Sequence, residues 1–122
     1  MIRKFATIFA LIALLAPGVS LAGDAAAGKA SYEANCASCH GPEGAGDDPV
    51  GAILDPKPRD FGAGDFKYDT DGDGEAGTDA DIKNIVANGA AAYGGNAMMA
   101  PLPHLEGEEI ENIIAFVRSL KK

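Results

Sequence analysis

Both cysteines of the 122-residue chain lie in the segment Cys36-Ala37-Ser38-Cys39-His40, and a histidine follows them directly. So dense a group of sulfur and nitrogen donors constrains the fold, because the chain around it has to suit whatever those side chains bind. Two thiols and one imidazole within five residues are compatible with four kinds of site.

Three of these kinds of site fit the rest of the sequence poorly. A dithiol redox site of the thioredoxin type belongs to a βαβ setting, and no run of four or more alternating residues predicts a strand here. Zinc requires about four ligands, which would use Cys36, Cys39 and both histidines, although the adjacent Cys39 and His40 point in different directions. A structural disulfide would close a very small loop and remove little chain entropy.

The fourth kind of site is the C-x-x-C-H motif of covalent haem attachment. Its spacing has a chemical reason, because two thiols bond the two vinyl groups at one porphyrin edge and the next residue places an imidazole nitrogen below the iron. Cys36 and Cys39 are therefore the expected anchors, and His40 is the expected proximal iron ligand. Haem would also supply apolar core to a small chain with 16 glycines and no tryptophan.

Residues 1–22 have the layout of a secretory signal peptide. Arg3 and Lys4 precede an apolar run, and the small residues Ser20 and Ala22 occupy the positions that a signal peptidase reads. The run is shorter than the ~20 residues that span a bilayer, so we predict cleavage after Ala22 rather than an uncleaved membrane anchor. We therefore expect a mature domain at residues 23–122 in the periplasm, with membrane association only transient or through an uncleaved signal.

The chain is acidic, with a formal net charge of −8. Loss of Arg3 and Lys4 with the signal peptide would take this charge to −10. An acidic surface disfavours nucleic acid and anionic lipid as partners and favours proteins that present basic docking surfaces. The same acidity would also serve to keep the protein soluble without any partner.

Three segments carry the apolar periodicity and end signals of helices. They run from residue 24 to 36, from 78 to 89 with Thr78 and Asp81 as a capping-box pair, and from 106 onward. The last has the clearest apolar stripe, formed by Ile110, Ile113, Ile114, Val117 and Leu120. We predict an all-α fold whose long loops wrap a bound group or are disordered. These loops run over roughly residues 41–77 and 89–104.

A second axial ligand for the iron would come from a distant segment, where the candidates are Met98, Met99 and His104. A methionine thioether favours Fe(II) and raises the reduction potential relative to a second histidine. Pro101 and Pro103 restrict the backbone of this segment, which suits a ligand that has to hold its position. Hydrophobic filling is the other ordinary role of a methionine, and we interpret His104 as a surface or capping residue.

Over residues 23–122 the chain resembles the class I c-type cytochromes. The resemblance rests on an early helix with Gly28 and Tyr32, on "CASCHG", on a loop with "DPKPRDF", on a methionine loop and on a terminal helix. It implies a small cytochrome c fold of three to four short helices, with long loops wrapped around one covalently attached haem c. It also implies that the first and last helices cross near Gly28, with Ile113 and Phe116 at the contact.

The resemblance assigns two further roles. When "MAPLPHLEGEEI" is aligned with the family's pattern, Met99 becomes the distal iron ligand and Met98 the second choice. The proline carbonyl that accepts a hydrogen bond from the far ring nitrogen of the proximal histidine would belong to Pro49, and this bond would orient the ring.

One acidic stretch departs from the family pattern. In "DTDGDGEAGTDAD", Asp69, Asp71, Asp73 and Gly74 match positions one, three, five and six of a calcium loop. Position twelve should be a bidentate glutamate, but it is Ala80. A solvated acidic turn before the next helix is the other interpretation of these residues.

The expected function is that of a periplasmic monohaem electron carrier, not an enzyme, whose iron cycles between Fe(II) and Fe(III). Two axial ligands would leave no open iron position for a substrate. Two alternatives remain from the sequence: a haem subunit of a larger respiratory complex, and a haem enzyme or gas-binding protein with an open distal site.

Overall fold

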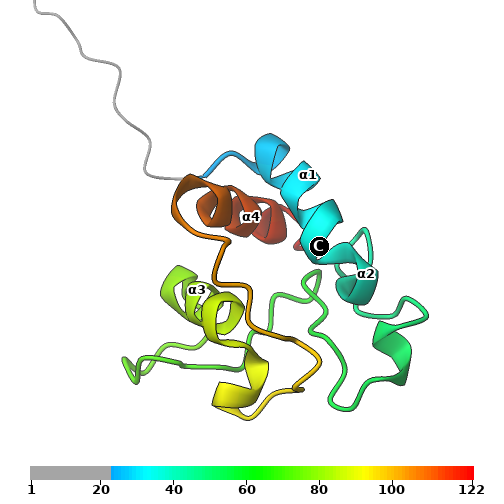
Figure 1. Cartoon of the computed structure of the whole chain (residues 1–122), viewed down its shortest axis with the longest axis vertical. Helices are drawn as coiled ribbons and strands as arrows, with labels where there is room; N and C mark the ends of the chain where they lie inside the picture. Colours follow the sequence, from blue (N-terminus) through cyan, green and yellow to red (C-terminus); the bar gives the residue numbers. More distant parts are fainter. Residues whose placement is uncertain (1–22) are drawn as a thin grey trace, which may run out of the picture.

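The computed structural model describes residues 23–122, so the expected signal peptide and its cleavage lie outside the described residues. The α helices are α1 (Ala25–Asn35), α2 (Ala37–His40), α3 (Asp79–Asn88) and α4 (Gly107–Ser119), and the 3-10 helices are η1 (Gly51–Ile53) and η2 (Ala90–Tyr93) (Figure 1). No strand occurs between residues 23 and 122. The predicted all-α fold is confirmed.

Within residues 23–122, no helix combines the length and the apolar composition that crossing a membrane would require.

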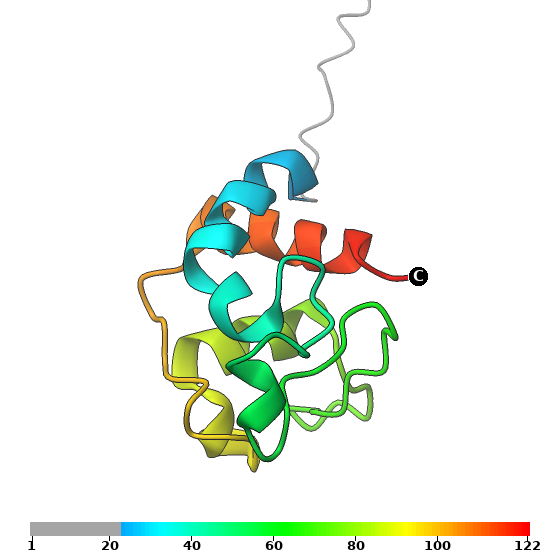
Figure 2. The ribbon, with the colours of Figure 1, turned by 90° about the vertical axis from the view of Figure 1, so that its right-hand side faces the viewer.

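Helices α1 and α4 cross on one side of the molecule, and α3 lies on the other side (Figures 1 and 2). Their approach is close because Gly28 has no side chain, and a Cβ atom there would overlap the backbone of Asn112. The Asn112 side chain in turn accepts a hydrogen bond from the N–H of Asp24 (2.8 Å). One turn along, the rings of Tyr32 and Phe116 lie with their centroids 4.9 Å apart. The predicted helix crossing at Gly28 is therefore confirmed.

The apolar core lies beneath this crossing. Tyr32 is fully buried, and its hydroxyl donates a hydrogen bond to the carbonyl of Gly41 (2.7 Å). This bond links α1 to the first residue after α2, so the core and the C-x-x-C-H segment are held together. The other buried core side chains come from α3, α4 and the segment before α4, and they are Val86, Leu105, Ile110, Ile113, Ile114 and Val117.

The helix ends follow the sequence signals with one difference. Asp24 caps α1, because its side chain accepts hydrogen bonds from the N–H groups of Ala26 and Ala27. Thr78 and Asp81 form the predicted capping box of α3. Glu106 occupies the N-cap position of α4, but its side chain makes no capping hydrogen bond. The start of α4 instead carries Glu108 and Glu109 in its first turn, where their charge complements the helix dipole.

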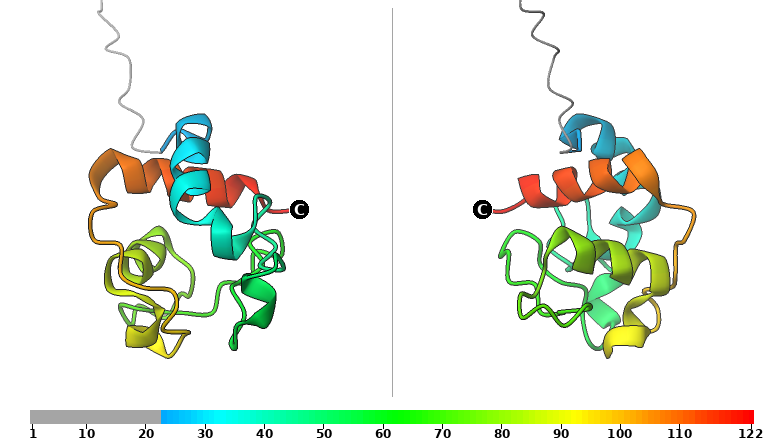
Figure 3. Two further views of the ribbon diagram at one scale, coloured as in Figure 1. Left: turned by 45° about the vertical axis from the view of Figure 1, so that its right-hand side comes forward. Right: turned by 90° about the vertical axis from the view of Figure 1, so that its left-hand side faces the viewer.

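The long loop between α2 and α3 is tied to the rest of the fold at several points. The N–H of Phe61 donates to the carbonyl of Gly44 (2.8 Å), and the N–H of Lys122 donates to the carbonyl of Gly62 (2.9 Å). The loop thus folds back on itself and is joined to the segment after α4. Figure 3 shows it beside α2 and below the end of α4. This path makes the loop one wall of the molecule's interior.

Candidate functional site

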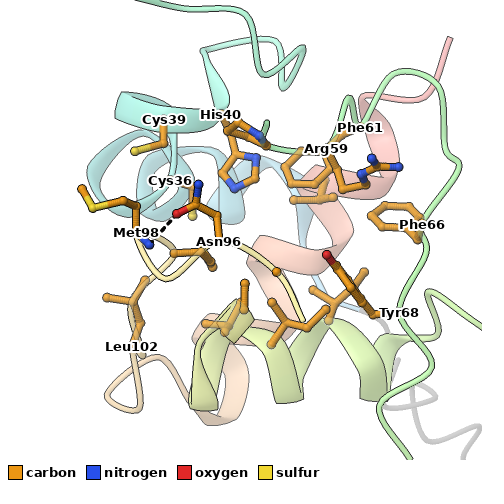
Figure 4. A pocket seen from close by; sticks show the side chains of 18 of the residues that line it. Cys36, Cys39, His40, Arg59, Phe61, Phe66, Tyr68, Asn96, Met98 and Leu102 are labelled. Atoms are coloured by element: carbon orange, nitrogen blue, oxygen red, sulfur yellow. Dashed lines mark hydrogen bonds between the residues drawn. The ribbon is translucent and has the colours of Figure 1, made fainter. Parts of the chain in front are cut away.

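A cavity of about 330 Å³ lies between the crossing of α1 with α4 and the opposite side formed by α3. The four α helices and the long loops between them contribute to its wall (Figure 4). Tyr32, Ile113 and Val117 come from the helix crossing, and Ile82, Ile85 and Val86 come from α3. Most of the wall is apolar, which is the character of a pocket that holds a large flat organic group.

The two cysteines line this cavity from the end of α1 and from α2. Both are half-buried, and before haem attachment both are free thiols. The N–H of Cys36 donates to the carbonyl of Tyr32 (2.8 Å), and the N–H of His40 donates to the carbonyl of Cys36 (2.9 Å). One helical turn therefore presents both thiols and the imidazole to the same space. Burial raises the pKa of the Cys36 thiol to about 11, so the free thiol is protonated at neutral pH.

His40 extends from α2 into the cavity (Figure 4). Burial lowers the pKa of its imidazole, against the opposing effects of the Arg59 backbone and the Asp48 carboxylate. The ring stacks on Phe61, with centroids 4.6 Å apart and an angle of 16° between the planes. Within residues 23–122, its buried Nδ1 atom has no hydrogen-bond partner of normal geometry. A neutral, oriented imidazole in an apolar space is suited to act as a metal ligand.

The backbone of Arg59 lies near the His40 ring. The Arg59 backbone acts on the imidazole as a hydrogen-bond acceptor would, because it favours the protonated ring. Pro49 is exposed and does not line the cavity. The loop folds so that the backbone of Pro58 lies against Gly46, close after the haem motif. The Pro49 role stays a prediction, because within residues 23–122 the buried Nδ1 of His40 forms no hydrogen bond with either residue.

The methionine segment forms another part of the wall. Met98 and Met99 both line the cavity, but the Met98 side chain is 66% exposed. Met99 is half-buried and packs against the core, and its carbonyl accepts a hydrogen bond from the N–H of Ala90 (3.0 Å). His104 is exposed and does not line the cavity. Of the three candidates for a second axial ligand, Met99 thus lies deepest.

Positive side chains also line this otherwise apolar space. Lys57, Arg59 and Lys67 belong to the wall, together with Tyr68. Haem carries two carboxylates on an apolar ring, and cations beside an apolar wall suit a group of that character. The cavity, the paired thiols, the neutral imidazole and the cationic wall residues all fit haem. Of these residues, sequence reasoning missed Lys57, Arg59, Lys67 and Phe61, although most lie in or near the "DPKPRDF" stretch that it had singled out.

The acidic turn before α3 is arranged differently from the predicted calcium set. Carboxylate oxygens of Asp69, Asp71 and Asp81 lie within 4.8 Å of one another, and Asp73 is not among them. Asp73 instead accepts a hydrogen bond from the N–H of Glu75 (2.9 Å). Calcium binding here stays a prediction, with Asp69 and Asp71 brought together and Asp73 turned to the loop backbone.

Asp81 is fully buried at this turn. It accepts hydrogen bonds from the N–H and hydroxyl groups of Thr70 (both 2.7 Å) and of Thr78 (both 3.0 Å). Burial acts to raise the pKa of this carboxyl, but the hydrogen bonds outweigh it and hold the pKa at about 2. Asp81 therefore joins the start of α3 to the loop that lines the cavity.

The comparisons with known proteins agree with this geometry. The family model "Cytochrome c" matches residues 25–121. No protein with curated annotation matches the chain significantly. Among solved structures, a chain of the reducing HAO-like protein complex of Kuenenia stuttgartiensis is 33% identical, with a TM-score of 0.63 over 78% of this chain. The match covers 41% of that chain, so our protein spans less than half of its solved relative. The chain described here belongs to the cytochrome c family and is a class I c-type cytochrome with covalently bound haem c.

Proposed function

We propose that this c-type cytochrome is a periplasmic one-electron carrier with His40 and Met99 as its axial ligands. The observation that carries the proposal is the convergence of Cys36, Cys39, His40 and Met99 on one apolar cavity from three separate parts of the fold. Haem bound there supplies an iron that exchanges single electrons between Fe(II) and Fe(III). The role is that of a carrier, not an enzyme, because two protein ligands leave no iron position open to a substrate.

The protein side chains perform three tasks in this function. Cys36 and Cys39 anchor the group, and His40 is held in one orientation by its stacking on Phe61. The apolar wall excludes water from the metal, which limits side reactions and solvent rearrangement during electron transfer. A thioether from Met99 favours the reduced state relative to a second imidazole.

The partners in this proposal are redox proteins with basic docking surfaces. The support is the net charge of −8 for the full chain, which steers association with a cationic surface at long range. Export is supported by the expected signal peptide at residues 1–22 and by the haem attachment motif. N-terminal sequencing of the mature protein should begin at Gly23.

A redox titration with absorption spectra on the exported holoprotein tests the proposal. We expect a reversible one-electron transition, a weak red-region sulfur-to-iron band in the ferric protein, and slow binding of carbon monoxide to the ferrous protein. A ferric protein without this band, together with rapid carbon monoxide binding, would show an open distal site and overturn the carrier assignment.

A second candidate function is that of a haem subunit in a larger assembly. It is favoured by one observation, since the similar solved chain belongs to a protein complex and the match covers only 41% of that chain. Native gel analysis of a gently prepared cell extract, probed for this chain, separates the two. A free carrier migrates at the mass of the single chain, and a fixed subunit migrates only with the assembly.

A further inference from the structure

Asn96 connects two loops that meet at the cavity. Its Nδ2 donates hydrogen bonds to the carbonyls of Asp55 (3.1 Å) and Pro56 (3.4 Å), some forty residues earlier in the chain. Its Oδ1 accepts a hydrogen bond from the N–H of Met98 (2.8 Å), drawn as a dashed line in Figure 4. Its own carbonyl accepts a further bond from the N–H of Met99 (3.1 Å). One residue thus contacts both methionines and the opposite loop.

The methionine segment is held on its other side by the region of α3 and η2. The N–H of Ala90 donates to the carbonyl of Met99 (3.0 Å), and the N–H of Leu102 donates to the carbonyl of Val86 (2.7 Å). Between the methionine segment and the 55–56 turn, the described residues 23–122 make no hydrogen bond other than those of Asn96. This side of the segment therefore depends on a single side chain.

The backbone just before Asn96 can bend easily. Gly94 has a φ of +86°, which lies in the left-handed region, and a Cβ atom placed there would contact nothing within 4 Å. Gly95 follows it directly. Gly95 is packed more closely, since its N–H donates to the carbonyl of Ala90 (2.8 Å) and a Cβ atom there would overlap the Ala90 side chain. Without the tie to the 55–56 turn, the residues from Asn96 to Met99 would keep their hydrogen bonds to the side of α3 and η2 and lose those to the opposite loop.

We propose that Asn96 is a positioning residue that ties the methionine segment to the Asp55-Pro56 turn and so holds Met99 at the iron. The inference rests on the proposed function, since it takes Met99 as the axial ligand. Asn96 itself supplies no ligand atom. The two ends of its side-chain amide act together. Nδ2 donates to the carbonyls of the opposite loop, while Oδ1 accepts from the N–H of Met98 and so fixes the backbone that leads into the methionines.

Two substitutions separate the two ends of the amide. Asn96→Asp keeps an oxygen that can accept from the Met98 N–H but loses the donor to the 55–56 carbonyls and places a carboxylate beside them. Asn96→Ala loses both ends. The control is Asn88→Ala, because Asn88 is an exposed asparagine whose Nδ2 bonds one side-chain group five residues later, the Tyr93 hydroxyl (2.8 Å), and neither Asn88 nor Tyr93 lines the cavity.

The measurements use the full exported holoprotein. The first is the pH midpoint at which the ferric sulfur-to-iron band disappears, and the second is the rate of carbon monoxide binding to the ferrous form. For both Asn96 variants we expect the midpoint to fall by about one pH unit and the binding rate to rise about tenfold, which is the scale set by losing one or two hydrogen bonds. Asn88→Ala should leave both quantities unchanged.

Amide hydrogen exchange gives a readout that does not involve the iron's ligands. We expect faster exchange at Met98 and Met99 in both variants, with unchanged exchange in α1 and α4. Unchanged midpoint, binding rate and exchange in Asn96→Asp would overturn the positioning role. If the wild-type protein lacks the band altogether, it is the Met99 ligation of the proposed function that fails, and exchange at the two methionines still tests the tie by itself.

Discussion

Gly28 of α1 lies against the backbone carbonyl of Asn112 in α4, with no room for even a methyl group between them. The crossing of these two helices carries Tyr32 and the C-x-x-C-H segment on one side and the core residues of α4 on the other. The distance between the helix axes at this point therefore determines how the cavity wall is assembled.

Gly28→Ala should destabilise the protein despite its better helix propensity. Alanine gains about 1 kcal/mol of intrinsic propensity over glycine in a helix, but overlap with a backbone group has to be relieved by separating the helices, at about 1–3 kcal/mol or more. Chemical denaturation of the holoprotein measures the net loss.

The control for Gly28→Ala is Ala30→Gly, on the exposed face of the same helix. It should lose only the propensity term, about 1 kcal/mol. A Gly28→Ala variant as stable as wild type would show that the crossing is looser than the structure indicates.

Met99→Ala should abolish the sulfur-to-iron band of the ferric protein, and Met98→Ala should keep it. The structural reason is their different burial, because Met99 packs against the core while the Met98 side chain is 66% exposed. Absorption spectra of the two purified variants decide between them. The opposite pattern would make Met98 the ligand.

Asp81 should contribute stability that is lost in acid. Its folded pKa of about 2 lies below the value of about 4 expected in an unfolded chain. A lowered folded pKa means that the contribution is fully present above about pH 4 and disappears as the pH falls toward 2.

Asp81→Asn should therefore lower the melting temperature by several degrees at neutral pH and by much less near pH 2. Thermal unfolding of variant and wild type across this range measures the difference. The control is Asp73→Asn, at an exposed position of the same turn. A melting-temperature difference that does not vary with pH would contradict the assigned role of the charge.

The charge of the molecule should govern the salt dependence of electron transfer. With a net charge of −8 for the full chain, the protein attracts cations at distances comparable to the Debye length. The rate of reaction with a small cationic metal complex should fall as ionic strength rises, and the rate with an anionic complex should increase. Stopped-flow measurements over a salt series test both reactions. Rates that do not change with ionic strength in either reaction would contradict electrostatic steering.

The sequence was sufficient where the signals are local. The spacing in "CASCH" fits within one helical turn, so the two thiols and the imidazole of His40 were predicted to contact one haem, and the structure places them on one cavity. The capping box of Thr78 and Asp81 and the apolar stripe of α4 are likewise signals of neighbouring residues. Gly28 was placed at the helix crossing through the family resemblance.

The sequence was insufficient where the path of a loop decides which residues lie close together. The family resemblance made Pro49 the expected acceptor for His40, whereas the folded loop leaves Pro49 exposed and brings the backbone of Arg59 near the ring. In the acidic turn, the predicted Asp73 faces the backbone, and Asp81 from the start of α3 takes its place in the cluster.

What the sequence determined by itself is the chemistry of the site: two thiols, one imidazole and the helical turn that presents them together. What only the tertiary structure decided is which groups far along the chain line the same cavity as that turn, among them Arg59, Phe61 and Asn96. The physical reason is that a helical turn is set by hydrogen bonds between residues three and four apart. The course of a glycine- and proline-rich loop is set by long-range contacts that leave no periodic trace in its residues.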